Sequence, residues 1–198
     1  MRKFNIYAAA VLVSIWAGAS YAGDKAAVWT LDPSLSNISF GSIKNDYTGE
    51  NHTFSDMSGS VDVHGKVSIT VGLASLETMI DIRNERMAEF VFQNAPSATI
   101  AAEVDMAELG NLSVNQATVI DTSGALSLLG TDTELDASIF VMRLSEDKVL
   151  VTTNGMIMLS TEDTAFNEGI DKLQELASLD SITRVSPVTM RLVFDANS

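Results

Sequence analysis

Stretches in which apolar and polar residues alternate recur along most of this chain. In the clearest of them, residues 67–73, four apolar side chains alternate with Ser68, Thr70 and Gly72. A period of two residues places one kind of side chain on each face of an extended strand. The pattern therefore predicts half-buried β-strands, which restricts the chain to folds in which a sheet covers an apolar interior.

Similar stretches lie on both sides of this one, and turn residues separate them. The strands expected are residues 27–31, 38–43, 54–63, 67–73, 99–104, 112–120, 125–129, 135–141, 149–159 and 188–194, with a hairpin turn at residues 122–124. Short connections favour antiparallel pairing, and about eight strands can close into a barrel that holds one small ligand. The predicted fold class is all-β: an antiparallel β-barrel of about eight strands with two short helices.

The first of these helices is expected within residues 76–92, where charges of both signs stand between apolar flanks. Ile80, Met87 and Val91 are spaced i, i+7 and i+11, which places them on one face of a helix. In a chain of strands, such an amphipathic insert is expected to cover an opening of the β structure.

The second helix is indicated by Ile170, Leu173 and Ala177, which are spaced i, i+3 and i+7. Side-chain oxygens can accept hydrogen bonds from the free N–H groups of a first helical turn. The residues expected to cap the two helices in this way are Thr78 or Asp81 for the first and Asn167 for the second.

The first 22 residues have the composition of a signal peptide. Arg2 and Lys3 precede a mostly apolar run at residues 6–19, and small residues at positions 20 and 22 form a cleavage pattern before Gly23. A membrane anchor is the weaker interpretation, because a spanning helix needs about 20 apolar residues. Residues 23–198 are predicted to form one domain that is exported to the periplasm without a stable membrane anchor.

Charge and cysteine content exclude several classes of partner and chemistry. The chain has 26 acidic and 12 basic residues, a formal net charge of −14, and no cysteine. Nucleic-acid binding depends on Lys and Arg that neutralise phosphates, and anionic membrane surfaces repel an acidic protein. Disulfides, metal thiolate sites and cysteine nucleophiles are excluded.

Catalytic and metal-binding patterns are also missing from the sequence. His52 and His64 are the only histidines, and their spacing matches no metal motif. Neither GxSxG nor a P-loop nor GxGxxG occurs. Asp132, Glu134 and Asp136 alternate without the glycine of a calcium loop, so a solvated face or a protected edge strand is expected there. We predict no enzyme activity and no cofactor.

Several motifs, taken in order, resemble those of the YceI-like family of exported lipid-binding proteins. They are Trp29-Thr30-Leu31-Asp32-Pro33 with Ser36 and Phe40; Phe54 with Ser58-Gly59; Thr78, residues 81–87, Phe90 and Phe92; Gly124, Leu126, Leu128 and Gly130; and Phe166-Asn167, Gly169-Ile170 and Val188. The resemblance covers nearly the whole of residues 23–198. It implies a lipocalin-like barrel that holds a long isoprenoid or a similar amphiphile.

The sequence departs from the family pattern at three positions. Many members have histidine where this chain has Leu35, Arg86 and Leu129. If those histidines contact a ligand head group, this chain is expected to prefer a different head group or none. The departure concerns the identity of the ligand and not the fold.

The ligand implied is a hydrophobic amphiphile such as an isoprenoid, an isoprenoid quinone or a fatty-acyl lipid. The residues expected at the barrel lining or mouth are Phe40, Phe54, Ile80, Arg83, Arg86, Met87, Phe90, Phe92, Met156, Met158, Phe166 and Ile170. Methionine suits an adaptable lining, although it can equally fill a core. Arg83 is expected either to meet a head group or to form a surface ion pair.

Two functions remain open from the sequence. In the first, the barrel binds, sequesters or transports the amphiphile in the periplasm. In the second, its own side chains fill the interior, and it is a structural or interaction module that binds no ligand. A homodimer is possible with either function.

Overall fold

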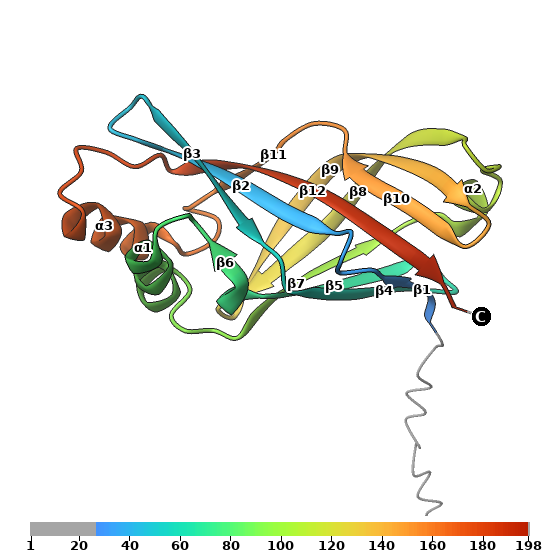
Figure 1. Cartoon of the computed structure of the whole chain (residues 1–198), viewed down its shortest axis with the longest axis horizontal. Coiled ribbons are helices and arrows are strands. Elements are labelled where there is room, and N and C mark those ends of the chain that lie inside the picture. Colours follow the sequence, from blue (N-terminus) through green and yellow to red (C-terminus); the bar gives the residue numbers. More distant parts are fainter. Residues whose placement is uncertain (1–26, 198) are drawn as a thin grey trace, which may run out of the picture.

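The computed structural model describes residues 27–197 and consists mainly of antiparallel strands (Figure 1). The predicted signal peptide, residues 1–22, lies outside the described residues. The strands are β1 (Ala27–Leu31), β2 (Asn37–Lys44), β3 (Thr48–Phe54), β4 (Met57–Asp62), β5 (Lys66–Gly72), β6 (Leu76–Glu77), β7 (Ser97–Glu103), β8 (Ala117–Leu128), β9 (Thr131–Ser145), β10 (Lys148–Thr153), β11 (Ile157–Ser160) and β12 (Val185–Ala196).

Eight of these strands close into a barrel in the order β1-β4-β5-β7-β8-β9-β10-β12, and β12 pairs with β1 to complete the circle. Every pairing between the strands is antiparallel, as short connections favour. The predicted all-β antiparallel barrel of about eight strands is therefore confirmed.

The sheet continues beyond this circle of strands because β12 is long enough to pair with two sets of strands. Its C-terminal part pairs with β1 and β10, and its N-terminal part pairs with β2 and β11. The corner between β1 and β2 is held by Ser36, whose Oγ donates to the Asp32 carbonyl at 2.7 Å and accepts from Val193 N–H at 3.0 Å. The β2–β3 hairpin thereby extends one end of the barrel.

Helices occupy the two ends of the barrel. At one end lie the 3-10 helix η1 (Leu73–Ser75), α1 (Asp81–Arg86), the π-helix η2 (Met87–Val91) and α3 (Asn167–Leu176), and at the other lies α2 (Met106–Gly110). Gly169 permits close packing of α3 on η2, because a Cβ there would lie 2.4 Å from the Phe90 carbonyl oxygen. The predicted insert thus covers an end of the barrel, and α2 is a third α-helix that the sequence pattern did not predict.

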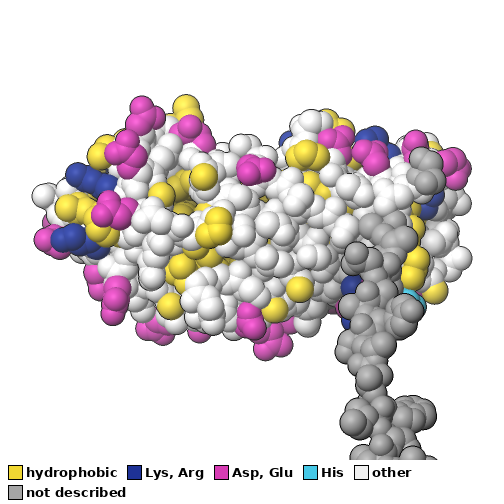
Figure 2. Space-filling view, turned by 90° about the horizontal axis from the view of Figure 1, so that it is seen from below, with side chains coloured by type: hydrophobic (Ala, Val, Ile, Leu, Met, Phe, Trp, Pro, Cys, Tyr) yellow, Lys and Arg dark blue, Asp and Glu magenta, His cyan; other side chains and the backbone are white. Residues whose placement is uncertain are grey.

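Acidic side chains are spread around the outer surface. Figure 2 shows them at the edges of the lower face, whereas hydrophobic side chains gather nearer its middle. Asp132, Glu134 and Asp136 are all exposed on β9, so the expected solvated face is confirmed. The alternative of an edge strand is wrong, because β9 lies between β8 and β10. No helix within residues 27–197 is long and apolar enough to cross a membrane.

Several strand boundaries differ from the prediction. Residues 122–124 form no turn but lie inside β8, and the chain reverses at Leu129 and Gly130, which have φ angles of 54° and 77°. Glycine at position 124 reflects close packing within the sheet, because a Cβ would lie 2.5 Å from the Ala101 carbonyl oxygen. A glycine in the sequence of a strand can indicate a close approach of two backbones as well as a turn.

The predicted strand at residues 149–159 is two strands, β10 and β11, separated by residues 154–156. The strand predicted at 54–63 is interrupted at residues 55–56, and the polar strand β3 precedes it. The sequence TGENHTF of β3 lacks clear alternation, which explains why it was missed. Its pairing with β2 across the turn at Asn45 and Asp46 makes it a strand all the same.

The predicted helix caps are wrong. Ile80 occupies the N-cap of α1 and Phe166 that of α3, and neither makes a side-chain capping bond. The Thr78 hydroxyl instead donates to Asn84 Oδ1 at 2.5 Å. The Asn167 Oδ1 accepts from the Thr161 hydroxyl at 2.5 Å and so ties the start of α3 to the β11 side of the barrel.

Candidate functional site: an apolar hollow along the barrel

Two hollows lie inside the barrel, one towards each end, with volumes of about 150 and 140 Å³. The lining of both is almost entirely apolar and comes from the inward faces of the strands. A cavity of about 150 Å³ lined by Leu, Ile and Phe stays dry and can hold a benzene ring. Each hollow therefore has room for a segment of an apolar molecule.

The two hollows meet at a waist. Both are lined by Ile100, Leu135, Ile157 and Met190, which come from β7, β9, β11 and β12. These side chains stand between the hollows without a charged or hydrogen-bonding group among them. A rotamer change of flexible side chains such as Met190 is enough to alter the width at this point.

The hollow at the helical end is lined by six of the residues predicted for the site. They are Phe40, Phe54, Met87, Phe92, Phe166 and Ile170. The four phenylalanines form a continuous row of ring contacts, with centroid distances of 5.6, 5.9 and 5.8 Å between successive rings. The strands and the helical insert supply this row together, which explains why residues far apart in the sequence meet here.

Four other predicted residues lie elsewhere. Phe90 is partly buried and packs against the core without lining either hollow, and Ile80 is 43% exposed at the start of α1. Met156 and Met158 are 67% and 61% exposed, so their predicted inward orientation is corrected. The break at residues 154–156 shifts the alternation, and a shift of one residue exchanges the two faces of a strand.

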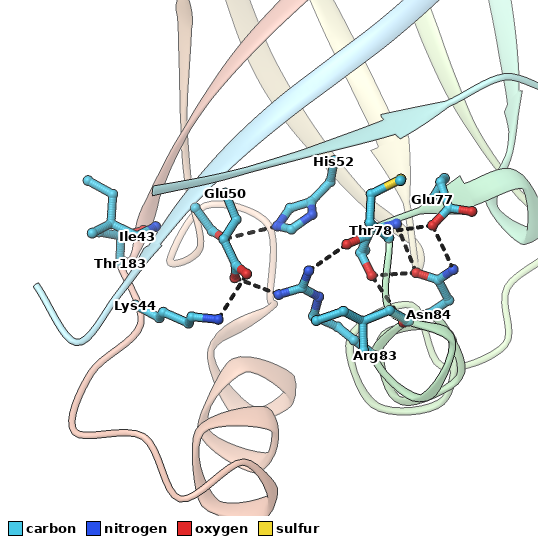
Figure 3. A network of polar contacts seen from close by, with 12 residues as sticks. Ile43, Lys44, Glu50, His52, Glu77, Thr78, Arg83, Asn84 and Thr183 are labelled. Atoms are coloured by element: carbon cyan, nitrogen blue, oxygen red, sulfur yellow. Dashed lines mark hydrogen bonds and ion pairs between the residues drawn. The ribbon is translucent and has the colours of Figure 1, made fainter. Parts of the chain in front are cut away.

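Arg83 is part of a polar network beside the helical hollow rather than of its lining (Figure 3). Its Nη1 donates to Glu50 Oε2 at 2.5 Å and its Nη2 to the Thr78 carbonyl at 2.5 Å. Lys44 also pairs with Glu50, at 2.9 Å. The hydrogen bond from Arg83 is the main reason that the pKa of Glu50 falls to about 2. Arg83 thus fastens the helical insert to β3 through a half-buried ion pair.

Arg86, the other predicted basic residue, also lines neither hollow. Its Nη1 donates to the Leu176 carbonyl at 3.4 Å, at the end of α3. The interaction joins the insert to α3 and leaves the arginine on the outside of the hollow.

His52 is a buried member of the polar network, with 2% exposure. Its Nε2 lies 2.9 Å from Ser42 Oγ, and its ring centroid lies 5.0 Å from that of Phe40. Burial, followed by the nearby charge of Arg83, lowers the pKa of His52 to about 4. Within the described part of the chain, His52 Nδ1 and Arg83 Nε have no hydrogen-bond partner.

Arg143 and Trp29, at the other end of the barrel, were not among the predicted site residues. Both line the hollow near α2, and the Arg143 guanidinium lies 5.3 Å from the Trp29 ring centroid. The alternation of β9 contained a usable signal, because Arg143 is two residues after Val141 and four after Ile139, both buried. The non-strand residues Met106, Leu109 and Leu112 close this end, and no periodicity of two marks them.

Residues 27–197 contain no cluster of three or more His, Asp or Glu side chains arranged to hold a metal ion. In this part of the chain, the only hydroxyls that line the helical hollow are those of Thr161, Thr164 and Ser186. What the site offers is therefore apolar burial with a few polar groups near its ends.

Comparison with known proteins places this geometry in a family. The model of the YceI-like domain matches residues 29–178. The chain belongs to the YceI-like family. Among solved structures, a polyisoprenoid binding domain from Saccharophagus degradans implicated in plant cell wall breakdown is 31% identical, with a TM-score of 0.84, and the alignment covers 87% of this chain and 100% of that one.

More distant members of the YceI-like fold share the architecture alone. BcnA from Burkholderia cenocepacia is 15% identical with a TM-score of 0.63, over 82% of this chain and 98% of that one. The YceI protein of Campylobacter jejuni is 17% identical with a TM-score of 0.51, over 74% and 85%. No functionally curated protein matches the chain.

Proposed function

We propose that this YceI-like protein binds a long-chain hydrophobic amphiphile along the axis of its barrel. The observation that carries the proposal is the pair of apolar hollows that meet at the waist formed by Ile100, Leu135, Ile157 and Met190. Transfer of an apolar chain from water into such a lining contributes about 0.8 kcal/mol for each buried CH₂. A long, narrow, apolar interior therefore favours a chain over a compact ligand.

The family supports the same class of ligand. The Saccharophagus protein, which is similar over its whole length, is described as a polyisoprenoid binding domain. The ligand that we propose is accordingly an isoprenoid, an isoprenoid quinone or a fatty-acyl lipid. The absence of a recognisable catalytic motif in the sequence favours binding without chemical conversion.

We further propose that the protein acts in the periplasm, where it sequesters or transports the amphiphile. The support is the signal-peptide composition of residues 1–22, which leaves residues 23–198 as the exported domain. A protein that encloses the apolar chain allows the lipid to cross an aqueous compartment.

A matched pair of neighbouring substitutions tests ligand binding. Ile157→Trp fills the waist, whereas Met158→Trp places the same side chain on the outer face of the same strand. After purification without detergent, each protein is incubated with a polyprenol or a fatty acid and examined by native mass spectrometry. Circular dichroism and thermal unfolding verify that both variants fold.

The wild-type protein and Met158→Trp are expected to take up one ligand per barrel, and Ile157→Trp to take up much less. Equal uptake by the two variants would show that the ligand does not occupy the waist. Apo protein alone in every sample would favour the alternative, a structural or interaction module without a ligand.

A further inference from the structure

Among residues 27–197, Arg143 is the one charged side chain that lines either of the two hollows. It lies near the C-terminal end of β9, at the end of the barrel that α2 covers. The helical end, where the sequence suggested a head-group contact, has no charged lining residue. The two ends of the barrel interior therefore differ in charge.

Several contacts hold the Arg143 guanidinium in place. Its Nε donates to the Ser145 carbonyl at 3.0 Å, its Nη2 donates to the Glu146 carbonyl, and its plane is near the Trp29 ring, 5.3 Å from the centroid. A cation over an indole face is attracted by the negative face of the ring. The main-chain bonds and the ring together fix the direction of the remaining donors.

The charge of Arg143 is not neutralised by a direct ion pair. None of the carboxylates in residues 27–197 lies within 4.0 Å of it, and its Nη1 has no acceptor in the same part of the chain. Arg83 is the contrasting case, because Glu50 and the Thr78 carbonyl already occupy its Nη1 and Nη2. The pKa of Asp147 is lowered mainly by the hydrogen bond from Ser145 and in part by the charge of Arg143, so one carboxylate lies nearby without forming an ion pair. Arg143 thus has a free donor, and a charge that no direct ion pair neutralises, beside an apolar hollow.

We propose that Arg143, with Trp29 beside it, binds an anionic oxygen of the ligand head group at the α2 end of the barrel. The inference rests on the proposed function and gives the ligand an orientation: the head lies at Arg143, and the apolar tail passes the waist towards Phe54 and Phe92. The chemical class is an amphiphile with a terminal carboxylate or phosphate.

The geometry favours a hydrogen bond to a single ligand oxygen over a bidentate contact. Two of the three guanidinium nitrogens already donate to main-chain carbonyls, so Nη1 is left for the ligand. A hydrogen bond to a charged partner is stronger than one between neutral groups, and an apolar surrounding strengthens it further. The acidic chain repels anions at long range, so the preference depends on this local contact.

Ligands that share one tail and differ in the head group test the inference. Oleyl alcohol, oleate and oleyl phosphate are titrated against the wild-type protein and against Arg143→Met and Arg143→Gln. Arg86→Met is the control, since it removes an arginine from the opposite end of the barrel without touching a lining residue. Affinities come from isothermal titration calorimetry or from displacement of a fluorescent fatty acid.

The wild-type protein is expected to bind oleate or oleyl phosphate roughly ten- to a hundredfold more tightly than oleyl alcohol. Whichever anion is preferred identifies the head group as carboxylate or phosphate. Both Arg143 variants are expected to lose this preference and to keep the affinity for oleyl alcohol, which also shows that they remain folded. Arg86→Met is expected to keep the preference.

Three results would overturn the inference, and one of them also tests the proposed function. If the wild-type protein binds all three ligands equally, or if Arg86→Met rather than the Arg143 variants loses the preference, the barrel binds an amphiphile but Arg143 does not select its head. If none of the three ligands binds, the proposed function fails together with the inference.

Discussion

Acidification should destabilise this protein through His52 before any carboxylate contributes. The ring is 2% exposed, and burial lowers its pKa from 6.5 to about 4. The unfolded chain therefore takes up a proton at this histidine at a higher pH than the folded protein does. The contribution to stability is fully present above pH 6.5 and is lost as the pH falls towards 4.

The size of the effect follows from the two pKa values. Proton linkage with values of 6.5 and about 4 gives a loss of about 2 kcal/mol in the free energy of unfolding between pH 7 and pH 4.5. Carboxylates contribute little in this range, because Glu50, with an ordinary pKa of 4.5 and a folded pKa of about 2, loses its contribution mainly below pH 4.5. The loss of stability between pH 6.5 and 4.5 therefore comes mainly from the histidine.

Urea unfolding at several pH values between 7 and 4.5 measures this loss. His52→Gln is expected to flatten the dependence, because its amide stays neutral and can still bond Ser42. His64→Gln is the matched control: it replaces the other histidine, which is exposed in the turn after β4, and should leave the dependence unchanged. A wild-type stability that is constant over this window, or a flattening by His64→Gln alone, would refute the reasoning.

The helical insert offers two further tests. Arg83→Met leaves the half-buried Glu50 carboxylate without its main partner, so urea unfolding should show that the free energy of unfolding falls by about 2–3 kcal/mol. The pKa of Glu50, followed by NMR, should rise. An unchanged pKa would mean that Arg83 is not the main partner of Glu50. Gly169→Ala places a Cβ against the Phe90 carbonyl oxygen. Thermal unfolding should therefore show a loss of stability of about 1–3 kcal/mol. An unchanged midpoint would show that α3 can shift without a loss of stability.

Periodicity of two was sufficient to predict the barrel, because inward and outward residues alternate in most of its strands. Strands β5 and β7 have the bounds expected from it to within two residues. It failed for β3, whose residues are mostly polar although His52 and Phe54 face inward. Tertiary pairing with β2 decides the structure of that segment, and a single-strand pattern does not contain this information.

The site was predicted best where its residues are aromatic and worst where a strand is interrupted. The row of phenylalanines belongs to the motifs that resemble the family, and the hollow at the helical end includes all four. Met156 lies in the break after β10 and Met158 follows it, so their alternation gave the wrong face. Arg143 was overlooked because a charged residue at an inward position contradicts the simple rule that inward residues are apolar.

A crystal structure of the protein with a bound long-chain amphiphile tests most directly whether one ligand occupies both hollows and the waist between them. We predict continuous electron density for one ligand that passes between Leu135 and Met190 and extends into both hollows. Density confined to the outer surface, or a ligand that occupies one hollow while the waist remains closed, would contradict the account.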